Sequence, residues 1–229
     1  MFPGGIGFYG NSVYGSIYGQ LLASYGSLNL TVSSPIQSFI EPLSLAEVKA
    51  FLAMQQADSA DGVDDDMIES TFIPAARDMA EYFQGKDLVL KQFDLSLDYW
   101  SYRMELRSPL VSVDLIQYLD STGAVFTLNQ GPDYIVDTAK MPGIVMPPYL
   151  ATWPSFTPWP SSAILIRFTC GLATTDAFWS STGKRIKMGM LYLISGWYEG
   201  RLPLTFGSVQ EIPFAISSCL GFGRLERVR

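Results

Sequence analysis

The sequence contains no histidine and only two cysteines, and both shortages exclude chemistry. Without histidine there is no Ser-His-Asp or Cys-His catalysis, and the common zinc and non-haem iron sites are excluded too. Cys170 and Cys219 are too few and too far apart for a disulfide framework, so a reducing compartment is the simpler inference. No glycine-rich stretch ends in Gly-Lys-Ser or Gly-Lys-Thr, which excludes a P-loop. We therefore predict that the protein is not an enzyme.

Charged side chains are missing from residues 1–40, and the first charge is that of Glu41. Four Tyr-Gly pairs recur in this region and begin at Tyr9, Tyr14, Tyr18 and Tyr25. Such dense glycine opposes helix formation and leaves little to bury. Two interpretations stay open: an extended arm whose tyrosines contact a neighbouring subunit, and a disordered tail.

The chain also lacks a long apolar run. The longest such stretch, near residues 186–197, is interrupted by Lys187 and is too short to span a bilayer. The first residues lack the basic flank and apolar stretch of a secretory signal. We expect a soluble protein that is not exported by the usual route and that has no membrane partner.

The remaining composition favours a packed fold with unevenly distributed charge. Of 229 residues, 48% are hydrophobic and 14% aromatic, which argues for a sizeable core. The net charge of −7 disfavours nonspecific binding to nucleic acid or to an anionic membrane. Residues 41–120 hold six bases and sixteen acids (6 − 16 = −10), whereas residues 184–229 hold seven bases and three acids (7 − 3 = +4). An acidic body with a basic end suits an acidic partner, and ordinary solvated faces explain it equally well.

Helical patterns begin directly after residue 43. Ser44 followed by Glu47 forms a capping box that opens a helix over about residues 44–54. A cluster of acidic residues follows as a connector, comprising Asp58, Asp61, Asp64, Asp65, Asp66 and Glu69. Its spacing does not match an EF-hand loop, so it is better interpreted as a solvated loop with charges at a helix start. We predict no metal and no cofactor.

Three further helices are expected. The second covers about residues 65–84, where Pro74 is expected to kink it and Gly85 to cap it. The others cover about residues 184–200 and 213–220, and a basic tail over residues 222–229 follows.

Between the second and third helices, residues 88–170 carry strand patterns. The first expected strand covers residues 89–97, whose second half alternates between apolar and polar residues. Further strands are expected over about residues 104–106, 113–119, 125–128, 134–136 and 163–170. The turn over residues 120–123 makes two of them a hairpin, and residues 147–160, with five prolines, form a stiff loop. The predicted fold is α+β, a small helical bundle with a β-meander inserted between its second and third helices, so that residues 41–229 form one domain.

Several short segments between about residues 41 and 225 match segments of a known protein family and occur in the same order. They are residues 43–49, 65–68 with 75–77, 81–86, 132–137, 142–145, 153–154, 164–171, 196–201 and 212–213. Together they resemble the head–tail connector (adaptor) proteins of tailed phages. The resemblance implies a structural virion protein that forms a dodecameric ring at the head–tail junction after assembly in the host cytoplasm. The portal protein would lie above the ring and tail or neck proteins below, while duplex DNA passes through the lumen without specific binding.

The resemblance also implies contact residues. The basic tail would reach the portal through Phe222, Arg224, Leu225, Arg227 and Arg229, although a frayed terminus is the other interpretation. Tyr198 is expected in helix packing and in subunit contacts. The sequence departs from the family at the arm of residues 1–40, at Pro74 and Gly189, and in its short tail.

Other functions stay open as alternatives. One is another neck or tail ring protein, such as a head-completion or tail-terminator protein. A different class is a histidine-free hydrolase that uses paired carboxylates, or a carbohydrate-binding module. Such a module would use a platform of tryptophans, Trp153, Trp159, Trp179 and Trp197, for which anchoring in the core is the commoner role.

Overall fold

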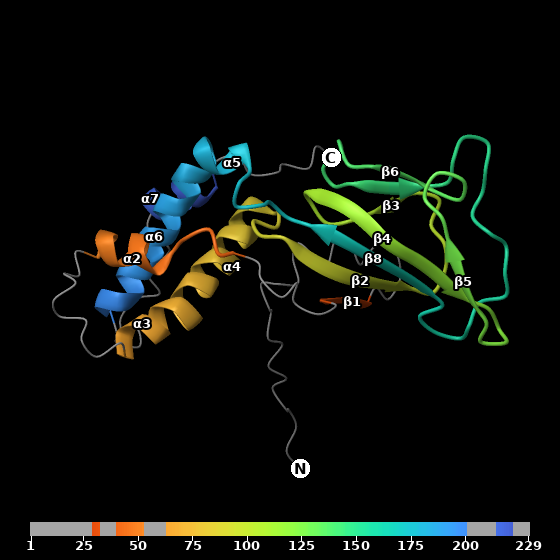
Figure 1. Ribbon diagram of the computed structural model, residues 1–229, viewed down its shortest axis with the longest axis horizontal. Coiled ribbons are helices and arrows are strands. Elements are labelled where there is room, and N and C mark those ends of the chain that lie inside the picture. The colour runs from red at the N-terminus through yellow and green to blue at the C-terminus, as the bar shows by residue number, and fades with distance from the viewer. Residues whose placement is uncertain (1–28, 33–39, 53–62, 201–213, 222–229) are drawn as a thin grey trace, which may run out of the picture.

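The computed structural model describes residues 29–32, 40–52, 63–200 and 214–221. These residues form two lobes, a helical bundle and a β lobe, which lie side by side in Figure 1. Each lobe has a hydrophobic core of its own. The α+β class predicted from the sequence is confirmed. In the part of the chain described, no helix combines the length and the apolar character needed to cross a membrane.

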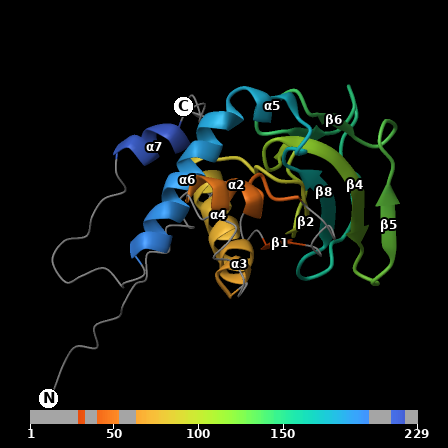
Figure 2. The ribbon, with the colours of Figure 1, turned by 60° about the vertical axis from the view of Figure 1, so that its left-hand side comes forward.

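The helical bundle brings together segments from both ends of the chain. Its elements are α2 (Leu45–Phe51), α3 (Val63–Met67), the π-helix η1 (Ile68–Phe72), α4 (Ile73–Gln84), α5 (Ala177–Ser180), α6 (Gly183–Gly200) and α7 (Phe214–Leu220). Figure 2 shows α2 and α4 on one side of α6 and α7 on another. Val48, Ile68, Ala76, Ile186 and Ile194 are fully buried between these helices, where their apolar surface is removed from water.

The capping box predicted at the start of α2 is confirmed. The Glu47 backbone N–H donates to Ser44 Oγ at 3.2 Å, and the Ser44 backbone N–H donates to Glu47 Oε2 at 2.8 Å. Two donors that the first turn leaves unpaired are thereby satisfied. The predicted end of this helix, residues 53 and 54, lies outside the described residues.

The helix predicted over residues 65–84 is divided into three segments. Pro74 lies in the first turn of α4 and has no N–H to donate backwards. Directly before it, the Ile73 N–H donates to the oxygen of Ile68, five residues earlier, as in a π-helix. The disturbance expected at Pro74 is therefore a widened turn of π-helix that lies directly before α4. Gly85 caps the helix as predicted, with φ 67° and its N–H on Glu81 O at 2.9 Å.

The β lobe contains two antiparallel sheets. The strands are β1 (Asn29–Val32), β2 (Lys91–Leu97), β3 (Met104–Glu105), β4 (Leu110–Leu119), β5 (Val125–Leu128), β6 (Ile135–Asp137), β7 (Ile144–Met146) and β8 (Ile164–Cys170). The five-stranded sheet has the order β1-β2-β8-β4-β5, and the three-stranded sheet has the order β3-β7-β6. Side chains between the sheets, including Phe168, Met104 and Ile116, form the core of the lobe.

The predicted β-meander is wrong. In a meander consecutive strands pair, whereas here β8, the last strand, lies between β2 and β4. Alternate residues of β8 are buried, as in a central strand with one face on the core. Alternation identifies strands but carries no information about their partners, so only the local β4–β5 hairpin could be predicted and is confirmed. Strand β1 also lies within the predicted arm, and it pairs with β2 of its own chain.

Candidate assembly surfaces

Most of the contact residues predicted from the sequence lie outside the described residues. These are the arm tyrosines and the tail residues, Tyr9, Tyr14, Tyr18, Tyr25, Phe222, Arg224, Leu225, Arg227 and Arg229. Described structure ends at Gly221, directly after α7, and the tail follows from there. Gln84 Nε2 donates to the carbonyl oxygen of Leu220, so the last turn of α7 is held on the end of α4. The point from which the tail departs is therefore fixed to the bundle.

Tyr198 is half-buried near the end of α6, against the bundle core. Its hydroxyl donates to Asp64 Oδ2 of α3 at 2.9 Å. This contact joins two helices of one subunit. A role of Tyr198 in contact with a neighbouring subunit stays a prediction.

The acidic connector and the tryptophans do not form ligand sites in the described residues. Asp65 pairs with Lys49 at 2.8 Å, and within those residues no three His, Cys, Asp or Glu side chains gather in a metal-binding group. Trp179 is buried and Trp197 half-buried in the bundle, whereas Trp153 packs in the β lobe. The four tryptophans therefore form no common platform.

A network of charged side chains lies where the two lobes meet. On α4, Arg77 is nearly buried and donates to Glu41, with Nε at 3.0 Å from Oε2, and to Asp78 at 2.6 Å. Burial lowers the pKa of Arg77, but the nearby carboxylates of Glu81, Glu41 and Asp78 outweigh this and raise it. One turn further, Glu81 accepts from Arg77 at 3.4 Å, so the guanidinium is surrounded by acceptors.

The network continues from Glu81 into the β lobe. Glu81 accepts from Lys91 Nζ of β2 at 2.5 Å and from the Leu88 backbone N–H at 3.0 Å. Burial raises the pKa of Glu81, although Lys91 acts in the opposite direction. Asp87, between α4 and β2, accepts from Arg107 Nε at 2.7 Å. These bonds fix how the bundle is placed against the sheet.

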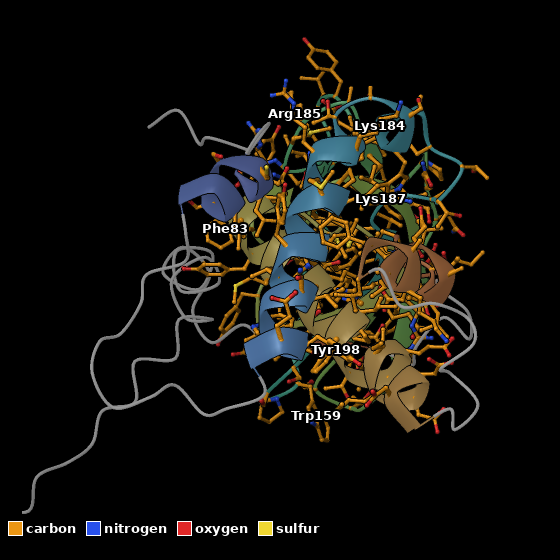
Figure 3. All side chains as sticks on the ribbon, turned by 90° about the vertical axis from the view of Figure 1, so that its left-hand side faces the viewer. Phe83, Trp159, Lys184, Arg185, Lys187 and Tyr198 are labelled. Carbon is orange, nitrogen blue, oxygen red and sulfur yellow. The ribbon has the colours of Figure 1, made fainter. Side chains whose placement is uncertain are left out.

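A cluster of basic residues marks the start of α6. Lys184, Arg185 and Lys187 lie at one end of this helix and Tyr198 at the other (Figure 3). Lys187 pairs with Glu47 of α2 at 3.2 Å, while Lys184 and Arg185 are exposed. Cations at a helix start interact unfavourably with the helix dipole, so the dipole does not favour this arrangement. It gives the helical lobe a positive surface within a chain whose net charge is −7.

The end of the β lobe remote from the helices is closed by stacked aromatic rings. The rings of Trp100 and Trp153 stack with centroids 4.6 Å apart. Tyr118 lies against Trp100 at 5.9 Å and stacks on Phe126 at 5.1 Å, and Phe156 packs on both Trp100 and Tyr118. Trp153 Nε1 donates to Ser101 O at 2.7 Å, which fixes the proline-rich loop onto the loop after β2. Aromatic pairs in this geometry each add about 0.5–1.5 kcal/mol beyond burial.

Exposed apolar side chains surround this stack. The exposed fractions are 74% for Tyr99, 68% for Tyr102, 44% for Phe126 and 43% for Trp159. We call these four residues, with the stack beneath them, the aromatic tip. Apart from Tyr118 of β4, the tip is built by residues 99–102, 121–132 and 141–166, and these three segments contain no charged side chain. Sequence reasoning missed this surface, although the runs without charge were visible.

Comparison with solved structures shows what this fold is similar to. A chain in the neck of an empty gene transfer agent (GTA) particle, computed with C6 symmetry, matches with a TM-score of 0.64 and 20% identity, over 88% of this chain and 97% of that chain. A chain in the neck of the native GTA particle, computed with C12 symmetry, matches with a TM-score of 0.60, and one in the native GTA virion with 0.62, both at the same identity and coverage. No family model and no curated protein matches the sequence. The resemblance to phage neck adaptor proteins predicted from the sequence is thus confirmed at the level of the fold.

Proposed function

We propose that this protein is a structural subunit of a phage-like neck, where copies form a ring that joins the portal protein to the tail and continues the DNA channel. The observation that carries this proposal is the fold, which is shared with a neck chain over 97% of that chain's length. The C12 symmetry of one such neck supports a ring of twelve copies. The role is geometric rather than catalytic, in keeping with a sequence that has no histidine and no P-loop.

The docking of the basic tail on the portal is part of this proposal. The tail begins directly after α7, which is held to α4 through the Gln84–Leu220 bond. Arg224, Arg227 and Arg229 supply charge-assisted donors for an acidic portal surface. Because α7 is held to α4, a contact of the tail with the portal would be mechanically coupled to the helical bundle.

The experiment that tests the function mixes the purified protein with portal rings from the same particle. We expect closed rings stacked on the portal, seen by electron microscopy, with a stoichiometry of twelve by mass measurement. Changing Arg224, Arg227 and Arg229 to serine should abolish stacking, whereas Lys184→Ser, the loss of one positive charge on α6, should not. If no association occurs at any salt concentration, the portal-adaptor function is wrong, and a lower neck or tail ring becomes the better assignment.

Passage of DNA without specific binding makes a separate prediction. The net charge is −7, and residues 41–120 alone carry −10, so a lumen formed from this part of the chain would repel phosphates. We expect the ring to show no measurable affinity for duplex DNA even at about 50 mM salt, where phosphate contacts are strongest. Tight binding in a fluorescence anisotropy titration would refute an acidic or neutral lumen.

A further inference from the structure

The aromatic tip is an unusual surface for a subunit in water. Tyr102 adjoins Trp153, whose ring stacks on Trp100, and the contacts continue through Tyr118 to Phe126. The stacked rings thus run from Trp153 to Phe126. The exposed Tyr99 and Trp159 lie at the same end of the lobe, because Tyr99 closely follows β2 and the Trp159 N–H donates to Leu119 O at 3.3 Å. Exposed apolar side chains gathered at one place and bordered by polar residues mark a site of interaction. Asp98, Arg103 and Asp120 border the segments that carry the exposed rings, and no charged residue lies within those segments.

The register of the sheet places the tip and the start of β1 at the same end of the lobe. Leu97, Ile164 and Tyr118 are neighbours across β2, β8 and β4, and Tyr118 pairs with Phe126 of β5. In the next row, Asn29 of β1 pairs with Ser96. The chain before Asn29 therefore joins the sheet at the end that carries the tip, only a few residues from Tyr99.

The 28 residues before β1 match the tip in character. They contain the four Tyr-Gly pairs and no charged side chain. Tyrosine supplies a large contact area with few rotatable bonds, and it is enriched where one protein binds another. An extended segment of this length reaches up to about 90 Å, far more than the roughly 20 Å between the outer strands of a five-stranded sheet.

The arrangement of copies in a ring determines which copy's aromatic tip residues 1–28 bind. In a ring each copy uses two different surfaces, one towards each neighbour. Strands β1 and β5 form opposite edges of one sheet. We propose that residues 1–28 of one copy bind the aromatic tip of the next copy around the ring. This inference rests on the ring of the proposed function and assigns the contact that the uncharged arm makes in it.

A binding measurement tests the contact without requiring a ring. A fluorescein-labelled peptide of residues 1–28 is titrated with the protein lacking these residues, and anisotropy is recorded. Phe126→Ser combined with Trp159→Ser should weaken binding by about 30-fold or more, as loss of central aromatic contacts does. The matched control is Met188→Ser with Tyr192→Ser on α6, where exposed fractions of 41% and 43% are close to the 44% and 43% of Phe126 and Trp159. The control should bind as the unchanged tip does, and circular dichroism melting curves verify that both variants fold.

A mixing experiment then shows whether the contact is made between copies. The protein without residues 1–28 keeps its tip, and the Phe126→Ser, Trp159→Ser variant keeps its arm. Mixed, they should form a one-to-one complex in sedimentation velocity that neither forms alone. Peptide binding without such a complex would mean that an arm attached to one copy does not reach the tip of another copy, and absence of peptide binding would mean that the arm has another partner. Either result overturns the inference, while stacking on the portal by the protein without its arm would leave the proposed function intact.

Discussion

Asp87 is a buried charge whose removal should strongly destabilise the fold. Its side chain is 1% exposed, between α4 and β2, and Arg107 donates to both of its oxygens, with Nε–Oδ2 at 2.7 Å. Cys170 also donates to Asp87 Oδ2 at 3.2 Å, and the Arg107 guanidinium lies 4.5 Å from the centroid of the Phe93 ring. Asp87→Asn keeps the shape of the side chain and removes its charge, which leaves Arg107 facing a buried neutral group.

The expected cost follows from the burial of this pair. Removing one partner of a buried ion pair typically costs 3–5 kcal/mol, because the other charge stays desolvated without compensation. For a chain of this size each kcal/mol corresponds to a change of about 2–4 °C in melting temperature, so Asp87→Asn should melt at least about 6 °C lower. The matched control is Asp94→Asn, since Arg167 binds Asp94 with the same two-bond geometry at 2.8 Å. That arginine side chain is 38% exposed, so this loss should stay within about 1 kcal/mol.

The assay is urea and thermal unfolding followed by circular dichroism, with a double-mutant cycle. Asp87→Leu and Arg107→Met, each alone, should be strongly destabilising, whereas the two together should recover most of the loss, because neither charge then remains buried alone. Equal small losses for Asp87→Asn and Asp94→Asn would refute the reasoning. Strictly additive effects in the cycle would refute it as well, because they would show that the two side chains are not coupled.

The remaining predictions concern the helical bundle. A Cβ at Gly189 of α6 would lie 2.7 Å from Leu220 Cδ2, so Gly189→Ala should destabilise by about 1–3 kcal/mol in urea unfolding. Gly196 of the same helix has nothing within 4 Å, so Gly196→Ala should instead stabilise by about 0.5–1 kcal/mol, and similar effects at both positions would contradict the close approach of α7. Burial raises the pKa of Glu47, but the Ser44 N–H and Lys187 outweigh it and lower the pKa below the ordinary 4.5. The folded state therefore binds fewer protons, so the advantage of the wild type over Glu47→Gln in melting temperature should be present above about pH 4.5 and vanish as the pH falls further. An advantage that persists at pH 2 would show that the carboxylate is not responsible.

The sequence predicts those features of this fold whose cause is local. Ser44 and Glu47 are three residues apart, and Gly85 directly follows its helix. A short stretch of sequence therefore predicts both the start of α2 and the end of α4. The Asp120 turn is likewise local and yields the β4–β5 hairpin. Pairing of β8 with both β2 and β4 joins residues that are between 46 (164 − 118) and 79 (170 − 91) positions apart, for which alternation gives no partner.

The assembly surfaces were less accessible to sequence reasoning for a related reason. Arg77 and Glu41 are 36 positions apart and Arg107 and Asp87 are 20 apart, so the charges of the junction appear in sequence as ordinary surface residues. The aromatic tip is assembled from Tyr118 of β4 and three further segments, and its tryptophans resemble core anchors until the register places them at one end. Gly189 appears in sequence as a weakness of a helix, whereas it is the place where α7 approaches α6.

The pairing of β2 with β8 has a consequence for how such proteins diversify. The chain enters the β lobe from α4 at Lys91 and leaves it towards α5 at Cys170, and these two residues face each other across the sheet. Neighbours on paired strands are only about 5 Å apart, so the whole lobe is an insertion with adjoining ends. A lobe of another size or shape can replace it while the helices on either side keep their positions, with β1 as the one strand contributed from outside the insertion. We therefore expect proteins of this fold to differ more in the β lobe than in the helical frame.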